Sequence, residues 1–260
     1  MRIDQLLVQR GLASTRSQAQ RLITAGVRWK TGGEWRRVAK NGDEVSDDAQ
    51  LDLLDGAEAR FVSRGGLKLD GALTHLGLSV EGLRCLDLGQ STGGFTDCLL
   101  QRGASHVVGV DVGYGQLSVS LRDDPRVTCI ERVNARHLNV DALHSESDPP
   151  QDAAAPFEEF DLVVGDLAFI SQTLVLPAAM PLLKPGGQVL MLVKPQFELQ
   201  PGQVGKGGIV TDEALFGLVE RRVRDAHAAL GLRVEAYFVS SIHGGDGNQE
   251  FFIHSIHSQE

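Results

Sequence analysis

The stretch Arg84–Leu100 reads RCLDLGQSTGGFTDCLL, an apolar strand followed by an amphipathic helix. Between the two lies a turn that contains Gly89, Gly93 and Gly94. Glycines let a ligand approach the backbone there, and the first N–H groups of the helix are free to bind it. Because ligands of open α/β sheets bind at the carboxyl ends of the strands, the stretch predicts an α/β fold with a ligand site at this turn.

The spacing of the glycines narrows the choice of ligand. A dinucleotide fold needs G-x-G-x-x-G, which crowds backbone donors around a pyrophosphate, and that spacing is absent. A P-loop needs a glycine where the chain has Gln200, ahead of Gly205-Lys206. A zwitterionic amino-acid group with an uncharged ribose fits this looser turn better, which predicts S-adenosylmethionine. The candidate contacts at the turn are Gly89, Ser91, Thr92, Gly93, Gly94 and Phe95.

Beyond the turn, apolar strands alternate with amphipathic helices. Strands are expected over 84–89, 106–111, 127–130, 161–166, 188–193, 232–241 and 250–256, and helices over 67–75, 93–102, 171–183 and 212–230. This rhythm predicts a mostly parallel sheet with helices on both faces. The last two strands are separated only by HGGDGNQ and should form an antiparallel hairpin at the sheet edge. A Rossmann-like seven-stranded sheet with an antiparallel last strand is the architecture of class I methyltransferases.

Length and composition leave room for a second, smaller unit. The chain has 260 residues with 42% apolar content, enough for an α/β core and a small module. No window approaches twenty uninterrupted apolar residues and no secretory signal is present, so we expect a soluble, cytoplasmic protein without a membrane partner. Cys85, Cys98 and Cys129 have no metal-ligand or disulfide spacing, so we expect buried reduced thiols and no metal.

Charge is distributed unevenly along the chain. Residues 1–40 hold nine Lys and Arg against Asp4 and Glu34, a net charge of +7, whereas the whole chain carries −9 and residues 41–260 therefore −16. A concentrated cationic patch on an acidic protein is typical of a surface that binds a polyanion, although a solvated basic face would look the same in sequence. The candidate residues for binding this polyanion are Arg2, Arg10, Arg16, Arg21, Arg28, Lys30, Arg36 and Arg37.

The first sixty residues also have their own pattern of elements. Two short amphipathic helices end at Gly11 and Gly26, with Ser14 or Thr15 as the N-cap of the second, and a strand pair follows around Gly32-Gly33. The run resembles the S4 type of RNA-binding module, although its hairpin departs from the usual V-x-V-N-G ending. The resemblance rests on Asp4, Leu7, Gly11, Leu12, Ser14, Arg16, Ala19, Leu22, Ile23 and Gly26.

These patterns divide the chain into three parts. We expect a small α+β RNA-binding domain over 1–60, a linker with a first helix over 61–82, and a methyltransferase domain over 83–260. Within the last part, residues 145–160 are acidic and rich in Pro and Ala, and are expected to form a solvated loop.

Two polar residues follow the strands next to the glycine turn. Asp111 ends the second strand of the sheet, where a carboxylate can accept both hydrogen bonds of a ribose diol or simply cap the strand. Asn134 follows the third strand and is a candidate contact on the adenine side, with an ordinary loop residue as the equally weighted alternative.

Four ionisable residues are expected to converge on the same edge of the sheet. Lys68 lies in the first helix, and Asp166, Lys194 and Glu250 stand at strand ends. Any one of them alone would be taken for a surface or ion-paired residue. Together they fit methyl transfer to a ribose 2′-hydroxyl, a poor nucleophile that gains from a nearby base. A lysine can serve as that base if burial and a second ammonium lower its pKa.

Seven motifs follow one another along the chain: VSRGGLKL, DLGQSTGGFTD, DVGYGQL, DLAFIS, LVKPQFE, VGKGGIV and GNQEFF. In this order they resemble the TlyA (hemolysin A) family of ribosomal RNA ribose 2′-O-methyltransferases. The resemblance implies methylation of ribosomal RNA in a ribosomal subunit, at a cytidine, with S-adenosylmethionine as cofactor and S-adenosylhomocysteine as product.

The same resemblance implies roles for individual residues. An FtsJ-type Lys-Asp-Lys-Glu tetrad falls on Lys68, Asp166, Lys194 and Glu250, with Lys194 as the general base and Asp166 also beside the cofactor. The cofactor's methionine carboxylate would be approached by Ser63, Arg64 and Gly65. Gln90 and Ala168 depart from the family pattern, but neither belongs to the tetrad.

Some interpretations stay open at this level. The glycine-rich segment over 195–210 fits a lid over bound RNA with Lys206 as a phosphate contact, or an ordinary surface loop. Two other functions compete with methyl transfer. One is a pore-forming haemolysin, suggested by the family's other name, and the other is a non-catalytic RNA-binding or assembly factor that kept the fold.

Overall fold

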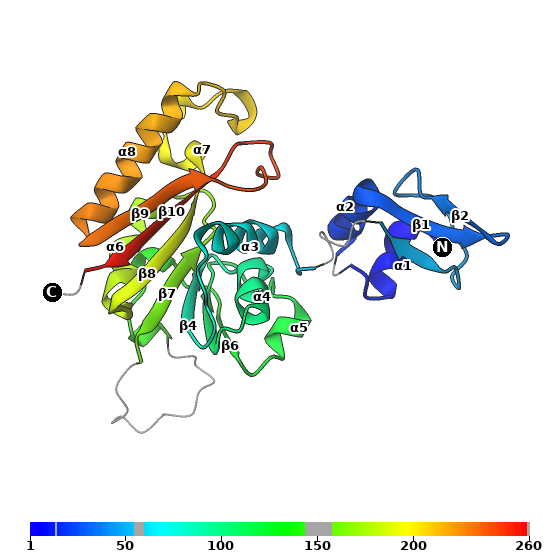
Figure 1. Ribbon diagram of the computed structural model, residues 1–260, viewed down its shortest axis with the longest axis horizontal. Coiled ribbons are helices and arrows are strands. Elements are labelled where there is room, and N and C mark those ends of the chain that lie inside the picture. Colours follow the sequence, from blue (N-terminus) through cyan, green and yellow to red (C-terminus); the bar gives the residue numbers. More distant parts are fainter. Residues whose placement is uncertain (14, 55–59, 144–157, 259–260) are drawn as a thin grey trace.

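The computed structural model describes residues 1–260 except 14, 55–59, 144–157 and 259–260. The described residues form one sheet of three strands and one of seven (Figure 1). The candidate N-cap Ser14 lies outside the described residues, as does most of the predicted acidic loop over 145–160. In the described part of the chain, no helix is long and apolar enough to cross a membrane.

The larger sheet has the predicted architecture. Its order is β6-β5-β4-β7-β8-β10-β9, with parallel pairing from β6 to β8 and with β10 antiparallel to both β8 and β9. The antiparallel terminal pair is therefore confirmed. The strands are β4 (Arg84–Leu88), β5 (His106–Val110), β6 (Val127–Ile130), β7 (Phe160–Gly165), β8 (Leu183–Val193), β9 (Leu232–Val239) and β10 (Phe251–His257).

Helices cover both faces of this sheet, because the side chains of each strand alternate between two apolar clusters. Cys85 packs in one cluster and Leu86 in the other. The first face carries α3 (Arg64–Leu76), α4 (Gly94–Gln101) and α5 (Val119–Arg122), and the second carries α6 (Leu176–Ala179) and α8 (Ala214–Ala229). Short elements follow several strand ends: α7 (Pro195–Glu198) and the 3-10 turns Ala135–His137, Asp141–Leu143, Pro201–Gln203 and Lys206–Gly208.

The helix predicted over 171–183 is wrong. The segment forms a 3-10 turn Gln172–Leu174, then α6, then a second 3-10 turn Met180–Leu182, and β8 begins at Leu183. Pro177 and Pro181 lack the backbone N–H that a continuous helix would use, so the segment breaks into short turns.

The N-terminal residues form a separate small core. Helices α1 (Ile3–Gln9) and α2 (Arg16–Gly26) pack on a sheet of order β2-β1-β3. Its strands are β1 (Val27–Thr31), β2 (Glu34–Arg37) and β3 (Leu51–Leu53). Thr15 is the N-cap of α2, since its side chain accepts a hydrogen bond from the Gln18 backbone N–H. The predicted hairpin is also confirmed, with φ of +58° at Gly32 and +88° at Gly33.

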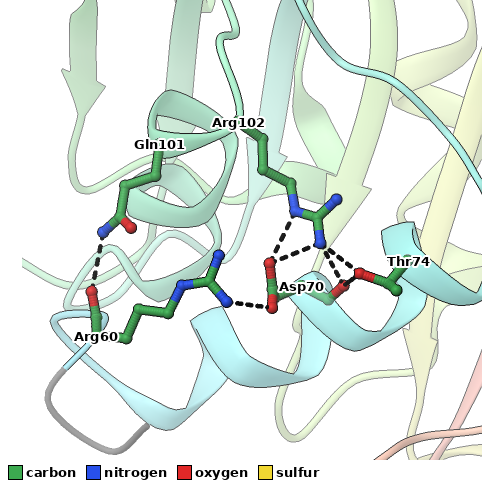
Figure 2. Close-up of polar contacts among 5 residues, drawn as sticks. All are labelled: Arg60, Asp70, Thr74, Gln101 and Arg102. Carbon is green, nitrogen blue, oxygen red and sulfur yellow. Dashed lines mark hydrogen bonds and ion pairs between the residues drawn. The ribbon is translucent and has the colours of Figure 1, made fainter. Parts of the chain in front are cut away.

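Polar contacts fix the chain where it enters the larger region. Figure 2 shows Asp70 of α3 bound by both Arg60 and Arg102. The Arg60 bond to Asp70 is 2.7 Å long and the Arg102 bond is 2.8 Å long. Gln101 of α4 donates to the backbone oxygen of Arg60, and Arg102 also donates to the Thr74 hydroxyl. These bonds hold α3 against α4. The start of α3 is thereby fixed beside the glycine turn.

Candidate active site

The turn between β4 and α4 lines a cavity of about 540 Å³. Its backbone is left-handed at Gly89, Ser91 and Gly93, with φ of +82°, +48° and +94°. A Cβ at Gly89 would lie 3.0 Å from the backbone oxygen of Asp166, which closes the neighbouring strand. Glycine is therefore required at this position by both conformation and space.

Two helices begin at the same point on the cavity wall. A Cβ at Gly94, the first residue of α4, would lie 2.1 Å from the Ser63 hydroxyl and 2.9 Å from the backbone nitrogen of Gly66 in α3. The N-terminal turns of α3 and α4 thus converge, with Ser63, Gly65 and Gly94 all lining the cavity. Free N–H groups and the positive ends of two helix dipoles favour an anion here.

Asp111 follows β5 and also lines the cavity. One carboxylate oxygen accepts from the Ser91 N–H at 2.8 Å, and the other accepts from the Gly113 N–H at 2.7 Å. These bonds fix the carboxylate, and each oxygen keeps a lone pair for a further donor. Asn134 also lines the cavity, where its side-chain oxygen accepts from the Arg136 N–H and starts a 3-10 turn.

Most of the residues predicted to contact the cofactor lie around this one cavity. Ten line it: Ser63, Gly65, Gly89, Ser91, Thr92, Gly94, Phe95, Asp111, Asn134 and Asp166. Gly93 and Arg64 are not among the lining residues. Gly93 packs against Leu121 instead, since a Cβ added at Gly93 would lie 2.4 Å from the Leu121 side chain. Arg64 donates instead to the backbone oxygen of His243.

The four tetrad candidates form two ion pairs next to the cavity. Lys194 Nζ lies 2.5 Å from Asp166 Oδ1, and Lys68 Nζ lies 2.6 Å from Glu250 Oε2. Lys194 and Asp166 line the cavity, whereas Lys68 and Glu250 are buried and are not among its lining residues. Burial raises the pKa of Glu250, the Lys68 and Lys194 charges lower it, and the Asp166 charge raises it. All four groups therefore lie within electrostatic reach of one another.

The chain matches two known protein families. Residues 61–256 match the FtsJ-like methyltransferase family and residues 1–26 match the S4 domain. A 16S/23S rRNA (cytidine-2′-O)-methyltransferase TlyA of Mycobacterium tuberculosis is 44% identical over 97% of this chain and 88% of its own length. Hemolysin A of Brachyspira hyodysenteriae is 35% identical over 98% of this chain and 100% of its own.

A solved structure described as a hemolysin from Streptococcus thermophilus is also similar, with 39% identity and a TM-score of 0.72. The match covers 100% of the present chain and 89% of the Streptococcus thermophilus chain. The chain belongs to the TlyA family of FtsJ-like methyltransferases. Both predicted resemblances, to this family and to the S4 module, are confirmed.

In this FtsJ-like methyltransferase, a group of hydrogen bonds around Asn248, here called the clasp, joins two loops and was not predicted from the sequence. Asn248 is buried in the β9–β10 connection, where it donates to Gly208 O and accepts from the Val210 N–H, both at 2.9 Å. Its amide also donates to Asp246, and so does Gln196 of α7. The clasp ties the glycine-rich loop to the segment that leads into Glu250. The exposed Lys206 sits on that loop.

A buried acid joins the two loops that follow β7 and β8. Glu198 of α7 accepts from the Ser171 hydroxyl at 2.5 Å and from the Gln172 N–H at 2.9 Å. Burial raises the pKa of Glu198. Because Asp166 precedes one loop and Lys194 the other, this bond helps to set the distance between them.

Phe169 was also missed, because it lies in an apolar run that reads as core. In this FtsJ-like methyltransferase it is 90% exposed and lines the cavity mouth, with its ring 5.3 Å from that of Phe197. Its φ of +64° is uncommon for a residue with a side chain. A strained backbone that presents an aromatic ring at a cavity mouth is typical of a ligand contact.

Gln90, which departs from the family pattern, has a structural place beneath the turn. Its amide donates to the Thr96 hydroxyl, which in turn donates to Asp87. The Gln90 side chain also fills the space that a Cβ at Gly109 would need. Asp87 is fully buried, and burial raises its pKa to about 7.

Seven of the predicted RNA-binding cations of the N-terminal region fall into two groups. Three have contacts that hold the N-terminal fold: Arg2 and Arg16 bond to Asp4, and Arg10 bonds to backbone oxygens of Ala49 and Asp47. The second group is on the β1–β2 hairpin: Arg28, Lys30, Arg36 and Arg37. Arg21 is half-buried on α2.

Proposed function

We propose that the protein transfers a methyl group from S-adenosylmethionine to the ribose 2′-hydroxyl of a cytidine in ribosomal RNA. The observation that carries the proposal is the Lys194–Asp166 pair at the cavity wall, backed by the buried Lys68–Glu250 pair. The names of the relatives supply the substrate. We further propose that the chain has three parts, an RNA-binding domain over 1–60, a linker with a first helix over 61–82 and a methyltransferase domain over 83–260. A ribosomal substrate implies a cytoplasmic location.

The cavity fits S-adenosylmethionine. The convergent starts of α3 and α4 suit the methionine carboxylate, through Ser63, Gly65 and Gly94. The fixed carboxylate of Asp111 suits the ribose diol, and Asn134 lies where the adenine would extend. When bound, this cofactor supplies an electrophilic methyl group on its sulfonium sulfur.

Lys194 is assigned the proton transfer because it is the lysine of the tetrad that lines the cavity. Asp166 holds its ammonium nitrogen at 2.5 Å, and the cation of Lys68 is paired with Glu250. In its neutral form Lys194 would accept the 2′-hydroxyl proton as the oxygen is methylated. Asp166 and Lys68 orient Lys194 and the hydroxyl, while Glu250 balances the second cation within the buried part of the site.

The RNA would reach this site as an extruded nucleotide, because a ribose within a helix stack cannot enter a walled cavity. Phe169 at the mouth offers a surface for the displaced base. The basic N-terminal region and Lys206 would bind phosphates around the target.

The decisive experiment replaces Lys194 by alanine. Lys194→Ala should abolish ribose methylation, mapped by mass spectrometry on ribosomal RNA, while S-adenosylmethionine binding stays measurable by calorimetry. The matched control is Lys184→Ala, since Lys184 lies near the start of β8, the strand that Lys194 follows, and pairs with Asp161 at 2.7 Å at the end of β8 away from the cavity. Retained methylation in Lys194→Ala would overturn the assignment of the base.

A further inference from the structure

One face of the β1–β2 hairpin gathers a tryptophan and three cations. In the hairpin register, Arg28 lies opposite Arg37, and Lys30 lies opposite Trp35. Opposite residues of an antiparallel pair project from the same face, and residues two apart along a strand share that face. The hairpin face therefore consists of Arg28, Lys30, Trp35 and Arg37.

The two tryptophans of the hairpin have different environments. Trp29 and Arg36 are paired in the same register and project from the opposite face. Trp29 packs against the small N-terminal core. Trp35 is 42% exposed, and Lys30 and Arg37 beside it are exposed as well. A large indole left at the surface has no role in the core of this region.

Arg28 is fixed next to the exposed indole. Its guanidinium lies 5.1 Å from the centre of the Trp35 ring. On its other side it forms an ion pair with Asp52 of β3 at 2.6 Å. The cation is thus held at the ring by a neighbouring strand, which orders the pair before any partner binds.

This arrangement is costly for the hairpin alone. Arg28 and Arg37 are directly opposite, and like charges in that position destabilise a strand pair. The acid in the two strands, Glu34, pairs with Thr31 and so projects from the other face. Asp52 of β3, which lies opposite Arg28, offsets part of this repulsion. A polyanion on the hairpin face would neutralise the exposed Lys30 and Arg37 as well, and an aromatic ring among the cations offers a stacking surface for a base.

We propose that the hairpin face binds an unpaired stretch of RNA, with one base stacked on Trp35 and the adjoining phosphates at Lys30 and Arg37. The proposal rests on the proposed function in taking RNA as the partner, and adds a second contact site outside the methyl-transfer cavity. A flat stacking surface needs a base with a free face, so duplex RNA does not fit it.

The chain's two tryptophans make the site directly observable. In full-length Trp29→Phe protein, Trp35 is the sole tryptophan, and titration with a single-stranded RNA of six adenosines should quench its fluorescence saturably. The reverse variant, Trp35→Phe, should show little quenching. Equal quenching in the two variants, or quenching of Trp35 by a duplex RNA of equal length, would overturn the stacking site.

A second comparison does not depend on replacing Trp29. Arg36 and Arg37 are adjacent and exposed but project from opposite faces of β2. Measured by fluorescence anisotropy of labelled RNA, Arg37→Ala should weaken binding and lower the salt slope by about one, whereas Arg36→Ala should leave both nearly unchanged. Trp35→Ala should weaken binding on the order of tenfold, with partial rescue by Trp35→Tyr. Equal losses for the two arginines would contradict the proposal.

Methylation by the wild-type protein is measured in parallel. Quenching without methylation would leave the hairpin site standing and refute the proposed function. Methylation without quenching would refute the hairpin site alone.

Discussion

The two regions of the molecule each bury an aspartate completely, with opposite results. In the N-terminal region, hydrogen bonds from Arg2 and Arg16 lower the pKa of Asp4 to about 2. In the larger region, Asp87 lies under the glycine turn with Thr96 and Gln90 as its neighbours, and burial raises its pKa to about 7. The partner therefore decides whether a buried acid keeps its charge.

The cations of the two regions differ in the same way. Lys68 and Lys194 are each held by one acid at short range, mostly out of solvent. Of the cations of the hairpin face, Lys30 and Arg37 are exposed at the surface, while Arg28 is half-buried and paired with Asp52. Fixed and partly buried pairs are little affected by salt, whereas exposed cations are screened and free to meet phosphates. The difference separates a chemical site from a binding surface.

Breaking the buried pair should have the largest effect. Lys68→Met leaves Glu250 without its cation, and loss of one partner from a buried pair costs about 3–5 kcal/mol. We expect no methylation and a free energy of unfolding in urea that is lower by about 3 kcal/mol. Adding Glu250→Gln should restore stability but not activity. The exposed Lys40→Met is the control, and equal stability of the two lysine variants would contradict this view.

Removing the basic region should have the next largest effect. Without residues 1–60, RNA binding should weaken by about a hundredfold and its dependence on salt should decrease, because the released counterions scale with the phosphates contacted. S-adenosylmethionine binding, measured by calorimetry, should persist and reports that the remainder is folded. Lys194→Ala in the full chain is the comparison, with an unchanged salt slope. A truncated protein that keeps the full slope would refute the separation of roles.

The last prediction concerns the dependence of stability on pH. Between the unfolded value of 3.8 and about 7, folded Asp87 holds a proton that the unfolded chain releases, so stability should fall as pH rises through this range. The slope contributed is up to about 1.4 kcal/mol per pH unit. Asp87→Asn should remove it in urea unfolding measured at several pH values.

Asp4 supplies the control of opposite sign. Its contribution is present above 3.8 and is lost as pH falls toward 2. Asp4→Asn should therefore leave the pH dependence of the free energy of unfolding unchanged near neutral pH and alter it only at acid pH. A neutral slope that survives in Asp87→Asn would assign the effect to another group.

Local signals in the sequence were enough for most of the fold. The alternation of strands and helices gave the sheet, since periodicity depends on which face of each element is buried. Gly32-Gly33 was enough for the hairpin, because two adjacent positive φ values suit glycine. The failure over 171–183 came from giving apolar periodicity more weight than Pro177 and Pro181.

The candidate site was predictable where it depends on strand ends. Asp111, Asp166 and Lys194 each follow a strand of a parallel sheet, so their positions on one rim follow from topology. Asn248 and Phe169 could not be found in this way. Asn248 acts through bonds to a loop some 40 residues away in sequence, and Phe169 looks like a core residue until its backbone turns it outward.

The sequence by itself determined the sheet, the glycine turn, the order of the motifs and the uneven charge, because each of these depends on neighbours along the chain. The tertiary structure alone decided which charges pair, which buried acid has a raised pKa and which face of the hairpin carries Trp35. Those properties depend on burial and on distances between segments far apart in sequence, and Coulomb energies and desolvation change steeply with both.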